Sequence, residues 1–162
     1  MNAATICAYV RDILDKYHER DPFRLCNDMD ILLNRAPMGV DIYASKGFYI
    51  RQFGINVITV NSDQPEYIQK IVCAHEIGHS VLHSDIVEAC CFENLNLTQK
   101  TEREANLFAA EYLLSDEIVL SHIEESESVY TLAQKLEVPT EILLYKLQTM
   151  ESKGIKYWSP LK

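Results

Sequence analysis

IVCAHEIGHSVLHS, residues 71–84, holds three of the five histidines of this 162-residue chain, at positions 75, 79 and 83. Four residues along an α-helix turn by about 400°, so His75 and His79 project from the same face, one turn apart. Both imidazoles can therefore reach one ion, and Zn²⁺ accepts neutral nitrogen ligands in tetrahedral geometry. Glu76 is rotated by about 100° from His75, beside such an ion, where it can act as a general base. The spacing predicts a zinc site with a catalytic glutamate.

The alternative is an amphipathic helix whose histidines are ordinary surface or core residues. Three features favour the metal site: the motif lies within a well-started amphipathic helix, Gly78 keeps the centre of that helix slim, and a glutamate-bearing helix follows at a suitable distance. His83 continues the same face one turn further on. Because nothing in Ser-Val-Leu, residues 80–82, breaks the helix, His83 lies about 6 Å further along the axis. We expect it to pack or to contact a ligand rather than to bind the ion.

Two histidines leave one zinc ligand to be found downstream. Glu102 in TEREANLFAAE, residues 101–111, is favoured because Asn106 lies one turn away on the same helical face. A carboxylate ligand and an amide that hydrogen-bonds a metal-bound histidine then fit together. A solvated acidic face is the alternative for this helix. The other candidates are Glu88, Glu93, Glu104, Glu111, Cys90 and Cys91, and Glu104 and Glu111 point elsewhere if Glu102 points inward.

The rest of the sequence predicts an α+β fold. An amphipathic helix is expected over residues 3–19 and a short second helix over residues 23–29. Residues 31–60 are rich in β-branched and aromatic side chains between turn formers, and ILLN, VDIYAS, GFYIRQF and NVITVN are interpreted as strands. Their short connections favour a small antiparallel sheet, packed on the helical core that carries the histidine motif. The predicted organisation is a domain that carries the metal site, over residues 1–125, and a helical extension over residues 126–162.

The C-terminal segment TLAQKLEVPTEILLYKL predicts two helices that meet at Val138-Pro139 and resembles a helix-turn-helix. Residues 129–150 carry two lysines, two glutamates and no arginine, so their net charge is zero. With a formal charge of −9 for the whole chain, direct nucleic-acid binding is not expected. We interpret the segment as a hairpin that packs on the rest of the protein.

The composition indicates a globular cytoplasmic protein. Apolar residues make up 48% of the chain, and no stretch approaches the roughly 20 apolar residues of a membrane span. No signal peptide is recognised at the N-terminus. The five cysteines follow no disulfide-framework spacing, which favours reduced thiols.

HEIGHSVLH followed by EREANLFAAEYLL resembles the ImmA/IrrE family of zinc-dependent metallopeptidases, and the likeness spans roughly residues 25–150. The resemblance implies a gluzincin-like zinc endopeptidase in which His75, His79 and Glu102 bind the metal and Glu76 is catalytic. It also implies a substrate, a helix-turn-helix repressor encoded nearby, whose cleavage derepresses the genes of a phage or mobile element. A stoichiometric antirepressor that binds the repressor without proteolysis is the alternative function.

Overall fold

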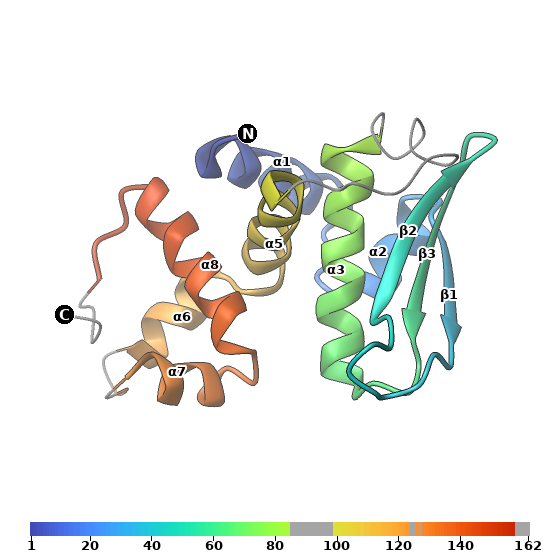
Figure 1. Cartoon of the computed structure of the whole chain (residues 1–162). Helices are drawn as coiled ribbons and strands as arrows, with labels where there is room; N and C mark the ends of the chain where they lie inside the picture. Colours follow the sequence, from blue (N-terminus) through green and yellow to red (C-terminus); the bar gives the residue numbers. More distant parts are fainter. Residues whose placement is uncertain (85–98, 124–125, 127, 158–162) are drawn as a thin grey trace.

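The computed structural model describes residues 1–157 except 85–98, 124–125 and 127. A small sheet lies at one edge of the molecule, and most of the helices lie on one side of it (Figure 1). The elements, in chain order, are α1 (Ala3–Tyr17), α2 (Pro22–Asp28), β1 (Leu32–Ala36), β2 (Gly47–Gln52), β3 (Ile55–Asn61), α3 (Glu66–Leu82), α5 (Gln99–Leu113), α6 (Asp116–Ile123), α7 (Val129–Lys135) and α8 (Thr140–Ser152). The predicted α+β class is confirmed.

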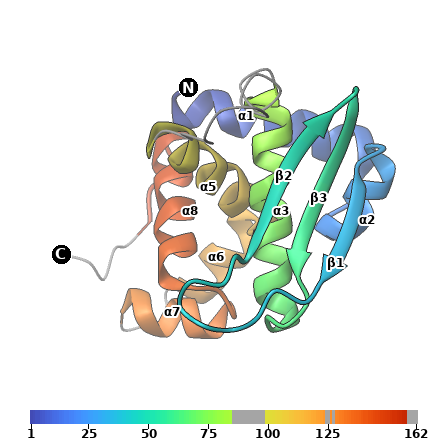
Figure 2. The same cartoon turned by 45° about the vertical axis from the view of Figure 1, so that its right-hand side comes forward.

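The sheet is mixed, so the predicted antiparallel pairing holds for one of its two strand pairs and not for the other. Its strand order is β1-β3-β2; β3 pairs antiparallel with β2 but parallel with β1. The connection between β1 and β2 carries the chain from one edge of the sheet to the other, and the tight turn after β2 then brings β3 back between them (Figure 2). Because the chain enters β1 and β3 from the same end of the sheet, these two strands run parallel. The short lengths of the connections in the sequence do not show this.

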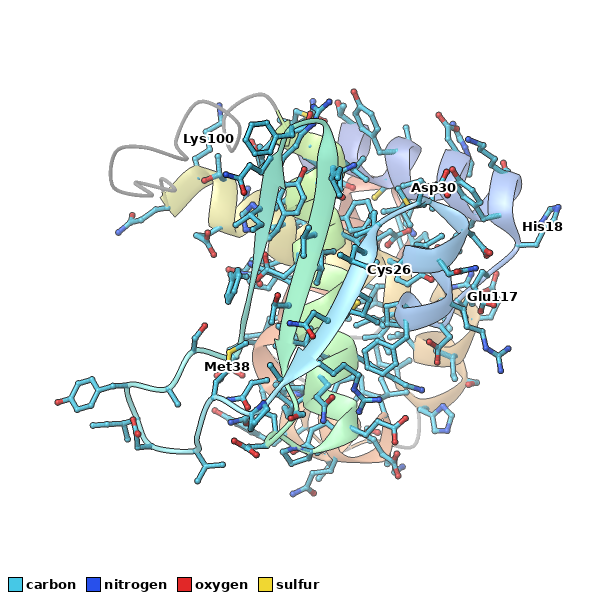
Figure 3. The ribbon with its side chains drawn as sticks, turned by 90° about the vertical axis from the view of Figure 1, so that its right-hand side faces the viewer. His18, Cys26, Asp30, Met38, Lys100 and Glu117 are labelled. Atoms are coloured by element: carbon cyan, nitrogen blue, oxygen red, sulfur yellow. The ribbon has the colours of Figure 1, made fainter. Side chains whose placement is uncertain are left out.

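The strand expected over VDIYAS is also wrong, because residues 40–45 form a loop. The side chain of Asp41 accepts a hydrogen bond from the backbone N–H of Tyr43, and this local contact replaces a strand ladder. The side chain of Asn61 donates to the carbonyl oxygens of Gly39 and Ser45, which ties both ends of the loop to β3. Figure 3 shows the loop after Met38 extending away from the sheet.

Helix α3 lies between the sheet and α5 (Figure 1). Its centre passes very close to α5 at Gly78. A Cβ atom at this position would lie 3.1 Å from Phe108 Cβ and 3.2 Å from Ala105 Cα, so the absence of a side chain lets the two backbones approach. This crossing brings the histidine face of α3 against the first half of α5.

Two apolar clusters form the core. The first is shared by α1, α2, the sheet, α3 and α5, and includes Ile6, Leu25, Ile58, Ile77 and Phe108. The second lies among α5, α6, α7 and α8, and includes Leu114, Val119, Leu132, Leu143 and Met150. Helices α7 and α8 therefore pack as the expected hairpin. The division into two domains near residue 125 stays a prediction.

Three of the five cysteines lie in the described part of the chain, one on each of α1, α2 and α3. Cys7, Cys26 and Cys73 are buried free thiols. Cys90 and Cys91, together with the candidate ligands Glu88 and Glu93, lie outside the described residues. No helix of the described part is both long and apolar enough to cross a membrane.

Candidate metal centre

His75 and His79 lie on one face of α3, and their Nε2 atoms are 3.1 Å apart. The side chain of His79 is 2% exposed and that of His75 is partly buried. Glu102, in the first turn of α5, faces the pair. Its Oε2 atom lies 3.3 Å from His75 Nε2, and its Oε1 atom lies 3.3 Å from His79 Nε2.

The three side chains form a set that can hold a metal ion, because one ligand atom from each lies within 4.8 Å of the others. A tetrahedral zinc ion with bonds of about 2.0–2.1 Å places neighbouring ligand atoms roughly 3.3–3.4 Å apart. The 3.1 Å between the two nitrogens and the 3.3 Å from each nitrogen to one oxygen of Glu102 are close to that spacing, with each histidine facing a different oxygen. Two nitrogens and one carboxylate oxygen are also the ligand types that zinc accepts while one position stays open.

Asn106 holds His75 from the outer side. Its Oδ1 atom accepts a hydrogen bond of 2.9 Å from His75 Nδ1. Nδ1 therefore carries a hydrogen, and Nε2 is the ring nitrogen that faces Glu102. The contact is the one expected from the one-turn spacing of Glu102 and Asn106.

His83 and Glu104 form a further contact that the sequence did not suggest. His79 Nδ1 lies 3.3 Å from His83 Nδ1, and His83 Nε2 lies 2.8 Å from Glu104 Oε2. Both side chains are at most 4% exposed. Glu104 points away from the three-ligand set, as expected, but into the protein. Glu104 is buried because the N-terminal segment covers this side of α5, and the amine of Met1 contacts the other oxygen of Glu104. Helical spacing within α5 does not indicate this long-range contact.

Glu76 lies beside the ligand set and is 8% exposed. Burial raises the pKa of its carboxyl group to about 7, and the negative charge of Glu102 acts in the same direction. The nearby His75 and a hydrogen bond from the backbone N–H of Tyr49 oppose this shift. A carboxylate whose pKa lies near neutrality can both take up and release a proton, as a general base and acid must.

The two histidines differ in their protonation. Burial and the neighbouring charge of His75 lower the pKa of His79 to about 4, so His79 is neutral and can act as a ligand at neutral pH. Burial also acts to lower the pKa of His75, but the hydrogen bond to Glu102 and the charges of Glu76 and Glu102 outweigh it and raise the pKa. The hydrogen bond with His75 lowers the pKa of Glu102 and keeps that carboxylate charged.

A comparison of the sequence with known protein families points to the same kind of site. The family of the IrrE N-terminal-like domain, Peptidase_M78, matches residues 26–148. The chain belongs to this family. An "Uncharacterized immunity region protein 2" of Bacillus phage phi105 is 30% identical over 138 residues, which cover 85% of each chain. The resemblance to the ImmA/IrrE peptidases is thereby confirmed, and the fold is of the metallopeptidase type.

In this Peptidase_M78 chain a cleft opens beside the ligand set. It has a volume of about 370 Å³ and is bounded by His75 and Glu76, by the start of β2, by α3 and by the start of α8. Its apolar walls are Ile68, Ile71, Val72, Pro139 and Ile142. Pro139 also borders a second cavity of about 620 Å³, which lies between Tyr67 and the turn that joins α7 to α8. The two cavities together extend from the candidate catalytic residues to the C-terminal hairpin.

The structure thus brings together all five side chains singled out in the sequence: His75, Glu76, His79, Glu102 and Asn106. Their individual roles stay predictions. His83 lies outside the ligand set and contacts His79, in line with the expectation that it packs or supports a ligand.

Proposed function

We propose that this chain is a zinc-dependent endopeptidase that cuts a helix-turn-helix repressor encoded nearby and so derepresses the genes of a phage or mobile element. The observation that carries the proposal is the convergence of His75, His79 and Glu102 at zinc-ligand spacing, with the buried carboxylate of Glu76 beside them. A site that holds zinc only for structure needs no buried base at its side. The position of Glu76 therefore favours chemistry.

The proposed mechanism assigns one task to each group of side chains. His75, His79 and Glu102 would hold the zinc ion, which supplies Lewis-acid activation of the scissile carbonyl and of the attacking water. Glu76 takes a proton from that water and later delivers it to the leaving amine. The buried position of Glu76 beside the three ligands places its carboxylate where it can serve both steps. Asn106 keeps the ring of His75 in the binding orientation.

The cleft beside the site supports a polypeptide substrate. Its aliphatic walls, Ile68, Ile71 and Ile142, can receive an apolar side chain next to the bond that is cut. The adjoining cavity at Tyr67 offers room for residues further along the same extended chain. A substrate segment would thus contact both α3 and the C-terminal hairpin.

The choice of a repressor as substrate rests on the family and on the relative. The ImmA/IrrE resemblance implies repressor cleavage, and the phage relative is named after an immunity region. The overall charge of −9 and the zero net charge of residues 129–150 argue against the chain acting on DNA itself.

Stoichiometric antirepression is the second candidate, and one surface feature favours it. The loop between β1 and β2 exposes Val40, Ile42 and Tyr43, which are 73%, 90% and 90% accessible, and such a patch can bind a protein partner without any chemistry.

Co-expression with the neighbouring repressor and a reporter gene separates the two candidates. Glu76→Gln keeps the size of the side chain but removes the base, so we expect it to retain zinc and to lose reporter derepression. Glu117→Gln, an exposed change on α6, should behave as wild type and is the matched control. Full derepression by Glu76→Gln would show that binding alone inactivates the repressor.

A further inference from the structure

The side chains behind His79 form a continuous hydrogen-bonded chain that the proposed mechanism does not use. It runs from His79 on α3 to His83, one turn later, and across to Glu104 on α5. His83 is 4% exposed and Glu104 is 3% exposed, so water does not compete for these contacts. Burying a carboxylate and an imidazole is costly unless both are hydrogen-bonded. The hydrogen bonds of His83 and Glu104 are therefore needed to offset the cost of burying both side chains.

The carboxylate of Glu104, at the end of this series of hydrogen bonds, determines where the hydrogens lie. An ionised carboxylate can only accept, so the hydrogen in the 2.8 Å contact with Glu104 Oε2 lies on His83 Nε2. With this hydrogen on Nε2, the ring of His83 can accept at Nδ1. In the 3.3 Å contact between the two Nδ1 atoms, His79 is then the donor.

This placement determines which nitrogen of His79 is free to bind a metal. With its hydrogen on Nδ1, His79 has a lone pair on Nε2, the atom that lies 3.1 Å from His75 Nε2 and 3.3 Å from Glu102 Oε1. We infer that His83 and Glu104 are positioning residues, which fix the tautomer and orientation of His79 so that Nε2 is presented to the metal. The inference rests on the proposed metal site and extends it by two residues on the side away from the substrate.

The two ligand histidines are thus supported in different ways. His75 donates to a neutral amide, Asn106, whereas His79 donates to an imidazole that is itself polarised by a carboxylate. Hydrogen-bond partners behind metal-bound histidines raise ligand basicity, and their loss typically costs about 10- to 100-fold in metal affinity. The contact between His83 and Glu104 connects α3 to α5.

The first test uses the metal-free wild-type protein labelled with ¹⁵N-histidine. Long-range ¹⁵N–¹H spectra report which ring nitrogen carries the hydrogen. We expect the Nδ1–H tautomer for His79 and the Nε2–H tautomer for His83. A His79 that carries its hydrogen on Nε2 would overturn the inference, whatever the variants do.

The second test measures zinc affinity by competition with a chelator. His83→Phe keeps a ring but removes both nitrogens, so we expect affinity to fall by about 10- to 100-fold. His83→Gln, whose amide can accept from His79 and donate to Glu104, should recover part of the loss. His122→Phe replaces a histidine of α6 and is the control. A folded His83→Phe protein with the zinc affinity of the control would refute the positioning role, and if that variant fails to fold, the tautomer spectra decide.

These outcomes are distinct from the fate of the proposed function. Zinc affinity that depends on His83, in a protein that cuts no repressor, would leave the inference standing and remove the peptidase. Repressor cleavage that depends on Glu76, with His79 in the Nε2–H form, would support the proposed peptidase and refute the positioning role of His83 and Glu104.

Discussion

Glu102 lies in the first turn of α5, where the helix dipole favours a negative charge. It supplies the only oxygen of the three-residue ligand set, and both of its oxygens face histidine nitrogens. Glu104, two residues later, points to the opposite side of the same helix and contacts His83 instead. The two glutamates therefore differ in what they contact, although both are close to a histidine.

Replacing Glu102 is predicted to weaken zinc binding more than replacing any hydrogen-bond partner of a ligand. Glu102→Gln keeps the shape but removes the charge that balances the ion, so the loss should exceed the about 10- to 100-fold typical of outer partners. Chelator competition on the purified variants measures it, with the exposed Glu117→Gln as control. Zinc affinity of Glu102→Gln equal to that of the control would remove Glu102 from the ligand set.

At the scale of single residues, helical spacing was enough to predict His75, Glu76, His79 and the pairing of Glu102 with Asn106. These relations are local, because residues one turn apart share a face whatever the tertiary structure. The contact between His83 and Glu104 joins two helices and depends on how α3 crosses α5 at Gly78. No pattern in the sequence determines that crossing.

At the scale of elements, helix types and bounds followed the apolar periodicity, whereas the sheet did not follow its apparent strands. VDIYAS alternates like a strand, yet Asp41 favours a local turn and the apolar side chains remain exposed. The parallel pairing of β1 with β3 depends on where the long connection crosses the sheet. Both are properties of the assembled sheet, which local β propensity does not encode.

Filling the cleft between α3 and α8 is predicted to block cleavage without affecting the metal. Ile68 lines this cleft, and it is a partly buried residue outside both apolar clusters, so Ile68→Trp can occupy the space with little effect on the core. We expect normal zinc content and at least about a tenfold loss of kcat/KM on the repressor, the loss that corresponds to about 1.4 kcal/mol of transition-state binding.

Ile118→Trp, at an exposed position on α6, is the matched control for Ile68→Trp. Equal cleavage by the two variants would show that the substrate lies elsewhere. Loss of zinc from Ile68→Trp would show that the variant disturbs the ligand set itself and would contradict the predicted separation between cleft and metal.

At the scale of the whole molecule, a buried ion cluster attaches α8 to the rest of the protein. Lys146 is 1% exposed and its Nζ atom lies 2.7 Å from both Glu111 and Asp116, on α5 and α6. Lys153 contacts the same two carboxylates from the end of α8, each at 2.6 Å. The start of α8 also forms one wall of the cleft, so the cluster helps to hold that wall in place.

Removing the buried cation should cost considerable stability. Lys146→Met preserves length and volume but leaves two carboxylates with one cation, so we expect the free energy of unfolding to fall by about 3–5 kcal/mol. Urea denaturation of the metal-free protein measures the change. Lys156→Met, at an exposed position, should change it by less than about 0.5 kcal/mol. An unaltered midpoint for Lys146→Met would contradict a stabilising role for the cluster.

The same cluster predicts how stability depends on acid pH. Burial acts to raise the pKa of Asp116, but its hydrogen bonds to Lys146 and Lys153 outweigh burial and lower the pKa below the ordinary value. A lowered carboxyl pKa means that the stabilisation is present above the unfolded-state pKa and is lost as the pH falls through the folded-state pKa. Between pH 5 and pH 2 the melting temperature of wild type should therefore fall more steeply than that of Asp116→Asn. Parallel curves would contradict this contribution.

The most direct test of the account is mass spectrometry of the repressor after incubation with the zinc-loaded protein. Hydrolysis at one bond predicts two fragments whose masses sum to that of the repressor plus one water, absent with Glu76→Gln and after zinc removal by a chelator. The rate with Glu76→Gln should be lower by at least about 10²-fold, the typical contribution of a general base. A repressor of unaltered mass that nevertheless loses DNA binding on mixing with wild type would contradict the proposed peptidase and establish stoichiometric antirepression.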